Sequence, residues 1–298
     1  MTIQETPVSV LSGSGDGAWT LRAAVRRCQA EAGAGAGAKA AVIAGVGTTA
    51  PGALKGRLLL DALAAAGVTP ARAVPFDDPR ALLADAGWDL ALVLSPWKKD
   101  AAALLAAGTG VLTGSAAATG VVDTVVRDGG RLVGVNTNCW SAQAAMETLM
   151  GGRAPAAVLV LGSGGSSGSV ALAVRRAWPD ARLAGSARNA AALAAWADRF
   201  GADAVAPGDL EDACRDAPPS LIVNATTWGE TPESEGREFA FPFNALAAPG
   251  NAYFDLNNRV SSLQTRALQA GMNVMSGTFM QRVTNACRAA LLTAEGTR

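Results

Sequence analysis

One stretch constrains the fold more than any other. Residues 156–178 read AAVLVLGSGGSSGSVALAVRRAW: aliphatic residues, a turn rich in glycine and serine, then apolar residues at helical spacing. This order predicts a buried strand, a tight turn and a helix that begins near Ser166. The first amides of such a helix and its dipole favour a phosphate group, as in dinucleotide-binding folds. Gly162 and Gly164 fit that motif, but Ser167 stands at its third glycine, so a turn used only for packing stays open.

Strand-like and helix-like segments alternate along the rest of the chain. Between Gly120 and Asn136, the residues Asp-Gly-Gly separate two apolar runs and predict a β-hairpin over 121–136. The remaining expected strands are 7–12, 39–46, 90–95, 157–161, the run ARLAGS and the run SLIVNAT, and the expected helices are 19–32, 53–67, 141–152 and NAAALAAWADRF. Such alternation is typical of a doubly wound parallel sheet.

We therefore expect an α/β protein with two domains. Residues 1–138 would form an α/β substrate domain to which 278–298 return, and residues 139–277 a Rossmann-type dinucleotide-binding domain.

Composition excludes several function classes. The 25 basic and 25 acidic residues cancel, which gives no reason to expect nucleic acid or an anionic membrane as a partner. No apolar run reaches the roughly 18 residues that a membrane span requires, and the first residues lack the pattern of a signal peptide. The four cysteines (Cys28, Cys139, Cys214 and Cys287) are scattered along the chain, so they predict neither disulfides nor a zinc site and fit a cytoplasmic protein. We expect a monomer or a homodimer.

The chain contains no histidine, which excludes the Ser-His and Cys-His mechanisms and weakens any metal site. Acid–base chemistry must therefore fall to Lys, Asp, Glu, Tyr or Cys.

The residues at the end of the strand after the glycine-rich helix indicate which cofactor binds. NAD-binding folds usually end this strand with an acidic residue that holds the ribose 2′-hydroxyl. Here it ends Gly-Ser-Ala-Arg, with Ser186 and Arg188 and no acid. A guanidinium in this place can hold a 2′-phosphate through charge-assisted hydrogen bonds. The alternative interpretation is a solvated surface arginine with no role in binding. We expect NADP.

Five segments together resemble the shikimate dehydrogenase family. LVLSPWKKDAAALL (92–105) is similar to the family's NVTxPxK, GVNTNCW (134–140) to GxNTDxxG, and VLVLGSGGSSGSV (158–170) to its GAGG turn. LIVNATTWGE (221–230) is similar to NATxxGM, and SGTFMQRVTNA (276–286) to DGxxMLxxQ. The resemblance implies cofactor binding by Gly162, Ser163, Gly164, Gly165, Ser166, Ser186, Arg188, Asn224, Ala225, Thr226, Gly277 and Met280.

The same resemblance implies a catalytic lysine, and Lys98 matches it. The family surrounds one substrate hydroxyl with this lysine, the Asp of NTD and the Asn of an AVNT segment. Here Asn138 replaces that Asp, while Asp123 replaces that Asn in GVVDT. We expect catalysis by Lys98, Asp123 and Asn138, with Asp123 holding the lysine; the competing interpretation is a solvent-facing Asp123 on the hairpin.

Other substrate-side positions also depart from the family pattern. The family's Gln aligns with Thr284, its Tyr with Asn258, and the Met of NATxxGM with Glu230. Trp140 replaces a small residue of the family pattern and would narrow the cleft that we expect between the two domains. In LSGSGD, Ser12 and Ser14 would take the place of a Ser-x-Ser that binds the substrate carboxylate.

Two hypotheses follow for function. The first is an NADP-dependent oxidoreductase that acts on a shikimate-like or modified cyclic small molecule, in a secondary pathway and not on shikimate itself. The second is a catalytically idle NADP-binding sensor, which the replaced side chains would permit.

Overall fold

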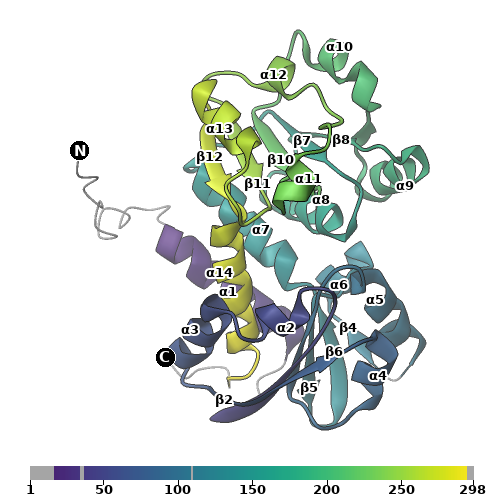
Figure 1. The fold of residues 1–298 in the computed structure, drawn as a ribbon, viewed down its shortest axis with the longest axis vertical. Coiled ribbons are helices and arrows are strands. Elements are labelled where there is room, and N and C mark those ends of the chain that lie inside the picture. Colours follow the sequence, from purple (N-terminus) through teal and green to yellow (C-terminus); the bar gives the residue numbers. More distant parts are fainter. Residues whose placement is uncertain (1–16, 34–36, 109, 294–298) are drawn as a thin grey trace.

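The computed structural model describes residues 17–33, 37–108 and 110–293. It contains two sheets, each in its own lobe (Figure 1). The expected α/β class with a Rossmann-type second half is confirmed.

The first sheet has the strand order β2-β1-β3-β5-β6-β4. Its strands are β1 (Ala40–Val46), β2 (Thr69–Phe76), β3 (Leu90–Val93), β4 (Val111–Leu112), β5 (Thr124–Asp128) and β6 (Arg131–Val135). The β5–β6 pair is the expected hairpin, and Gly129 and Gly130 take φ values of 54° and 86° in its turn. Both values lie in the left-handed region that a tight hairpin turn requires.

Short helices flank this sheet: α2 (Ala50–Ala53), α3 (Arg57–Ala65), α4 (Pro79–Ala84), α5 (Lys98–Ala107) and α6 (Gly114–Thr119). The helix expected over 53–67 is wrong at its beginning, because α3 begins only at Arg57 and Ala53 ends the separate helix α2. Gly56 separates them with an extended backbone (φ −68°, ψ 132°) as the N-cap of α3. The expected strand at 7–12 lies outside the described residues.

The second sheet is fully parallel and has the order β12-β11-β10-β7-β8-β9. In chain order this is the 3-2-1-4-5-6 arrangement of dinucleotide-binding folds. Its strands are β7 (Ala157–Leu161), β8 (Arg182–Ser186), β9 (Asp203–Ala204), β10 (Leu221–Asn224), β11 (Ala252–Asp255) and β12 (Asn273–Ser276). Its helices are α8 (Gly165–Ala177), α9 (Ala190–Phe200), α10 (Leu210–Cys214), α11 (Pro232–Glu235), α12 (Phe243–Leu246) and α13 (Ser262–Gln269), with a 3₁₀ turn at Pro207–Asp209.

Three helices join the two sheets: α1 (Gly17–Ala32), α7 (Thr137–Met150) and α14 (Gly277–Ala290) pack on one another, and α7 and α14 run between the lobes (Figure 1). The expected helix at 141–152 begins earlier, because Asn136 caps its first turn, and it ends at Gly151 with φ 58°. We propose that the domains divide as the sequence predicts, with the first boundary inside the first turn of α7.

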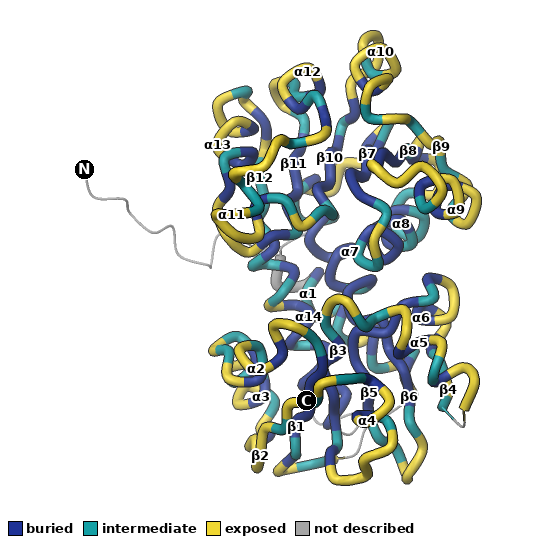
Figure 2. The backbone as a smooth tube through the Cα atoms, turned by 45° about the vertical axis from the view of Figure 1, so that its right-hand side comes forward, coloured by how far each residue is buried: buried dark blue, intermediate teal, exposed yellow. Residues whose placement is uncertain are grey.

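Each half has its own core of buried apolar side chains. The central strands β3, β10 and β11 are fully buried, whereas the edge strands β2 and β9 are largely exposed (Figure 2). Among the described residues, no helix combines the length and the apolar composition that crossing a bilayer requires.

Candidate active site

The residues expected to bind a cofactor gather at the carboxyl ends of the second sheet's strands. Gly162 follows β7 with φ 108°, and a Cβ there would lie 3.1 Å from the carbonyl oxygen of Ala225, just after β10. The amide of Gly162 also donates to the carbonyl of Ser186 at the end of β8 (2.8 Å). Ligands of open α/β sheets bind at this edge.

The turn itself leaves room for a ligand. Gly164 is the N-cap of α8, and a Cβ built on it would meet no atom within 4 Å. No side chain caps α8, and the hydroxyl of Ser167 bonds to the carbonyl of Gly164 (2.6 Å). Nearby, the hydroxyl of Ser186 is buried and has no hydrogen-bond partner among the described residues. An open turn, an uncapped helix and an orphaned hydroxyl together fit a bound dinucleotide.

Arg188 lies between the end of β8 and the beginning of α9. The neighbouring Asn189 caps this helix through the amide of Ala192 (3.0 Å), whereas the exposed Arg188 makes no ion pair or hydrogen bond to any side chain that the structure describes. Its guanidinium is therefore available to an anion at the end of β8.

The Asn-Ala-Thr segment after β10 is held rigidly. The Oδ1 atom of Asn224 accepts hydrogen bonds from the amide (3.1 Å) and the hydroxyl (2.7 Å) of Thr226, and its Nδ2 donates to Asp255 on β11 (3.2 Å). Burial raises the pKa of the Asp255 carboxyl, while surrounding donors oppose this effect. These donors include Tyr253, Asn257, Ser261 and Gln264.

Lys98, from the first half of the chain, lies beside the glycine-rich turn of the second half. It is the first residue of α5 and is half-buried. A Cβ built on Gly165 would lie 3.9 Å from the Cβ of Lys98, so the lysine stands beside the beginning of α8. Burial lowers the pKa of Lys98, the cationic Arg288 acts in the same direction, and the negative charges of Asp123 and Glu230 oppose them.

Asp123 is completely buried, so the solvent-facing interpretation is wrong. Its Oδ1 accepts from the hydroxyls of Thr124 (2.8 Å) and Thr137, and its Oδ2 accepts from the amide of Asn138 (2.7 Å). The carboxylate thus faces the N-terminus of α7, where the helix dipole favours a negative charge. No ion pair joins it to Lys98 among the described residues, so its charge acts on the lysine without the direct contact that we expected.

Asn138 and Thr284 lie together, although 146 residues separate them in the chain. The Thr284 hydroxyl, on α14, lies 3.3 Å from Asn138 Oδ1 and 2.8 Å from the hydroxyl of Ser141. Both are buried, and the backbone amide of Asn138 bonds to Asp123. The helices α7 and α14 therefore join these predicted site residues.

Other expected site residues are placed differently. The side chain of Asn258 is exposed and bonds to no described residue. Met280 is only 6% exposed and packs in the core of the second half. A Cβ on Gly277 would lie 2.0 Å from the carbonyl oxygen of Leu256, so this position requires glycine. Ser12 and Ser14 lie outside the described residues.

Sequence reasoning missed the loop after β1. Gly47 has φ 122°, and a Cβ there would lie 2.9 Å from the carbonyl oxygen of Ser95; the amide of Thr48 donates to that oxygen (3.1 Å). Since β1 pairs directly with β3, Thr48 and Thr49 lie at the same sheet edge as Lys98. The signal was the apolar run 40–46 followed by glycine and two threonines.

The side chain of Trp140 lies against α1 and α8. Its ring lies under the guanidinium of Arg176 (4.3 Å), and its Nε1 donates to Glu31 on α1 (2.9 Å). Glu31 also accepts from the amide of Ser115 on α6 (2.6 Å) and pairs with Arg176 on α8 (3.4 Å). This cluster ties α1, α6, α7 and α8 together.

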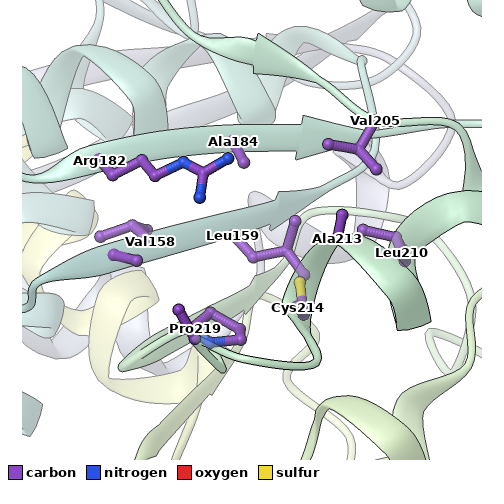
Figure 3. Close-up of a pocket in the computed structure, with 11 residues that line it drawn as sticks. Val158, Leu159, Arg182, Ala184, Val205, Leu210, Ala213, Cys214 and Pro219 are labelled. Carbon is purple, nitrogen blue, oxygen red and sulfur yellow. The ribbon is translucent and has the colours of Figure 1, made fainter.

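A cavity in the second half is separate from the site. It is lined mainly by apolar side chains from β7, β8 and α10, among them Val158, Leu159, Ala184 and Leu210 (Figure 3). None of its lining residues is among those gathered around Lys98, Asp123 or the glycine-rich turn.

No family model matches the chain. A shikimate dehydrogenase (NADP(+)) from Oleidesulfovibrio alaskensis is 30% identical over 171 residues, which are 57% of this chain and 59% of that protein. The match therefore spans less than two thirds of the relative's length.

Solved structures extend the likeness over most of the chain. The shikimate 5-dehydrogenase from Thermus thermophilus in complex with NADP(H) and shikimate has a TM-score of 0.66 and 26% identity, over 82% of this chain and 90% of that one. The quinate dehydrogenase from Corynebacterium glutamicum in complex with NAD has a TM-score of 0.70 and 22% identity, over 84% and 93%. These comparisons confirm the resemblance and the fold that the motifs predict.

Proposed function

We propose that this chain, a diverged relative of the shikimate and quinate dehydrogenases, is an NADP-dependent oxidoreductase. It moves hydride to or from a carbonyl or alcohol carbon, or an imine or amine carbon, of a shikimate-like or modified cyclic substrate. The observation that carries the proposal is the position of Lys98, whose Cβ lies 3.9 Å from a Cβ built on Gly165, because a lysine side chain that begins beside the glycine-rich turn can supply a proton-exchanging amine there.

The cofactor would lie along the carboxyl edge of the second sheet. Its pyrophosphate would take the first amides of α8, the buried hydroxyl of Ser186 would serve the adjacent ribose, and Arg188 would pair with the 2′-phosphate. When bound, NADP supplies the carbon that accepts or releases the hydride. The name of the Oleidesulfovibrio relative and the Thermus complex agree with this cofactor.

Lys98 would hold the reacting proton. Because burial lowers its pKa, more of the amine is neutral near physiological pH than in an ordinary lysine, and a neutral amine can accept the proton of a substrate hydroxyl. In the reverse direction the ammonium form returns the proton to the carbonyl oxygen. Asp123 opposes complete loss of that proton through its charge.

The substrate side is predicted to differ from that of a shikimate enzyme. Asn138 offers an amide where the family has a carboxylate, and Thr284 lies close to its oxygen. Thr48 and Thr49 supply hydroxyls at the sheet edge. A site built around particular hydroxyl groups strongly rejects analogues that lack them, which supports a substrate other than shikimate itself.

The second candidate is an NADP-binding sensor without catalytic activity. The observation that favours it is the lack of an ion pair between Asp123 and Lys98 among the described residues. The enzyme hypothesis predicts that Asp123 contacts Lys98, and the sensor hypothesis predicts that Asp123 faces solvent. In the structure Asp123 is buried and its carboxylate faces α7, which neither hypothesis predicts.

The experiment compares Lys98→Met with Lys99→Met, since Lys99 is the exposed neighbour on the same helix. Turnover is followed by NADPH absorbance on a panel of cyclic hydroxy acids and ketones, and NADP affinity by calorimetry. We expect Lys98→Met to lose turnover and keep NADP affinity, and Lys99→Met to keep both. Full turnover in Lys98→Met contradicts the assigned role.

A further inference from the structure

Arg288 is a buried arginine that has no direct carboxylate partner within residues 17–33, 37–108 and 110–293. It lies on α14, one turn beyond Thr284, and is 5% exposed. Its Nε donates to the hydroxyl of Thr124 (3.0 Å), its Nη1 to Asn285 Oδ1 (3.1 Å), and its Nη2 to the carbonyl oxygen of Asp123 (3.2 Å). No ion pair reaches it from the described residues, although a guanidinium is costly to bury without compensation.

Compensation comes through one intervening hydroxyl. Thr124 accepts from Arg288 and donates to Asp123 Oδ1 (2.8 Å), so the cation and the carboxylate are linked in a continuous chain of hydrogen bonds. Both ends of this chain are buried, with Asp123 at 0% exposure. Such a linked pair stabilises both charges, whereas removing one partner leaves an uncompensated buried charge.

We infer that Arg288 is a positioning residue of the active site, which supplies the counter-charge for Asp123 and through it controls the electrostatic environment of Lys98. The inference rests on the proposed function for its catalytic meaning only, because the electrostatic relation itself can be measured without substrate or cofactor.

The charges around Lys98 come from three different elements. Asp123, before β5, and Glu230, after β10, raise the pKa of Lys98, while Arg288, on α14, lowers it. Around Arg288 itself, Asp123 and the thiols of Cys28 and Cys287 act in the direction of the charged form. Removal of the Arg288 charge leaves burial as the remaining cause that lowers the pKa of Lys98. The pKa of Lys98 in the variant is therefore higher than in the wild type.

The test uses the low lysine content of the chain, which has four lysines: Lys39, Lys55, Lys98 and Lys99. Reductive methylation with ¹³C-formaldehyde gives one dimethylamine NMR signal for each, and Lys98→Met assigns the signal of interest. The signal is titrated with pH in the wild-type chain, in Arg288→Met, in Arg288→Lys and in Arg282→Met, whose arginine is exposed on the same helix.

We expect an upward shift of the Lys98 midpoint in Arg288→Met, none in Arg282→Met, and recovery of most of the wild-type value in Arg288→Lys. The Lys99 midpoint stays unchanged in all of them. A folded Arg288→Met whose Lys98 midpoint equals that of the wild type overturns the inference, whatever the chain does with NADP.

A stability cycle keeps the inference testable if Arg288→Met does not fold. Here Arg288→Met is combined with Asp123→Asn, and unfolding is followed in urea. If the two charges compensate each other, the double variant is more stable than the sum of the single losses predicts. Strict additivity overturns the inference. If the chain turns over a substrate, the pH dependence of kcat is also measured for Arg288→Met. A shifted pH profile with an unchanged KM indicates a positioning role, because a merely structural role would not move the pH profile.

Discussion

Gly164→Asp is predicted to separate cofactor binding from folding. Gly164 is the N-cap of α8 with an ordinary extended backbone (φ −77°, ψ −175°), and a Cβ there meets no atom within 4 Å. Aspartate is among the best N-cap residues, and α8 has no side-chain cap at present. The substitution should therefore stabilise the chain by about 0.3–1 kcal/mol from capping and the helix dipole.

The same carboxylate would oppose the pyrophosphate. A charge placed about 5 Å from one phosphate charge, at an effective dielectric constant of about 20, costs about 3 kcal/mol. With salt screening and a second phosphate, we expect a loss of about 2–4 kcal/mol, which is roughly 30- to 1000-fold in NADP affinity.

Calorimetry measures the NADP affinity, and urea unfolding measures the stability. Gly164→Asn is the matched control, because it has the same shape and capping ability without the charge and should lose less affinity. Gly162→Ala is the opposite case: its φ of 108° and the nearby Ala225 carbonyl predict a loss of stability of about 1–3 kcal/mol. NADP affinity that is unchanged in Gly164→Asp would refute the placement of the pyrophosphate.

Three further predictions concern single side chains. Arg188→Ala should weaken NADP binding by about 1.5–3 kcal/mol and leave NAD binding nearly unchanged in calorimetry; equal losses for both cofactors argue against 2′-phosphate recognition. Lys98→Met should melt at a higher temperature than the wild type near neutral pH. The pKa of Lys98 is lowered on folding, so the stability deficit of the wild type is present at pH values below the folded pKa and disappears as pH rises above the ordinary lysine pKa; an equal melting temperature at every pH contradicts this. Glu31→Gln should lower the free energy of unfolding by about 1–3 kcal/mol, because the carboxylate accepts from Ser115, Trp140 and Arg176; an unchanged urea midpoint would show that this cluster is dispensable.

The second half of the chain was predictable because its signals are local. The glycine-rich turn, the apolar strand before it and the helix after it follow one another within residues 156–178, and the structure forms them as β7 and α8. The Asp-Gly-Gly hairpin and the Gly151 helix end are local in the same sense. Each depends on backbone conformations that few residues other than glycine adopt.

The substrate side was less predictable because its contacts are long-range. Arg288 reaches the Asp123 carbonyl across 165 residues, and in the sequence it resembles any cation near a helix end. Asp123 follows a helix-ending glycine and is predicted as a hairpin residue, yet its carboxylate accepts hydrogen bonds from Thr137 and Asn138 on α7. Thr48 and Thr49 were not predicted as site residues, because their place at the sheet edge depends on the pairing of β1 with β3, which no local sequence pattern indicates.

The most direct test of the account follows the hydride itself. The chain is incubated with NADPH deuterated at the transferable position of nicotinamide C4, together with a panel of cyclic keto acids and imines, and products are analysed by mass spectrometry. We expect deuterium on the former carbonyl or imine carbon of at least one panel member with the wild-type chain and with Lys99→Met, and none with Lys98→Met. NADPH that binds the wild-type chain and transfers deuterium to no panel member would contradict the account and favour the sensor.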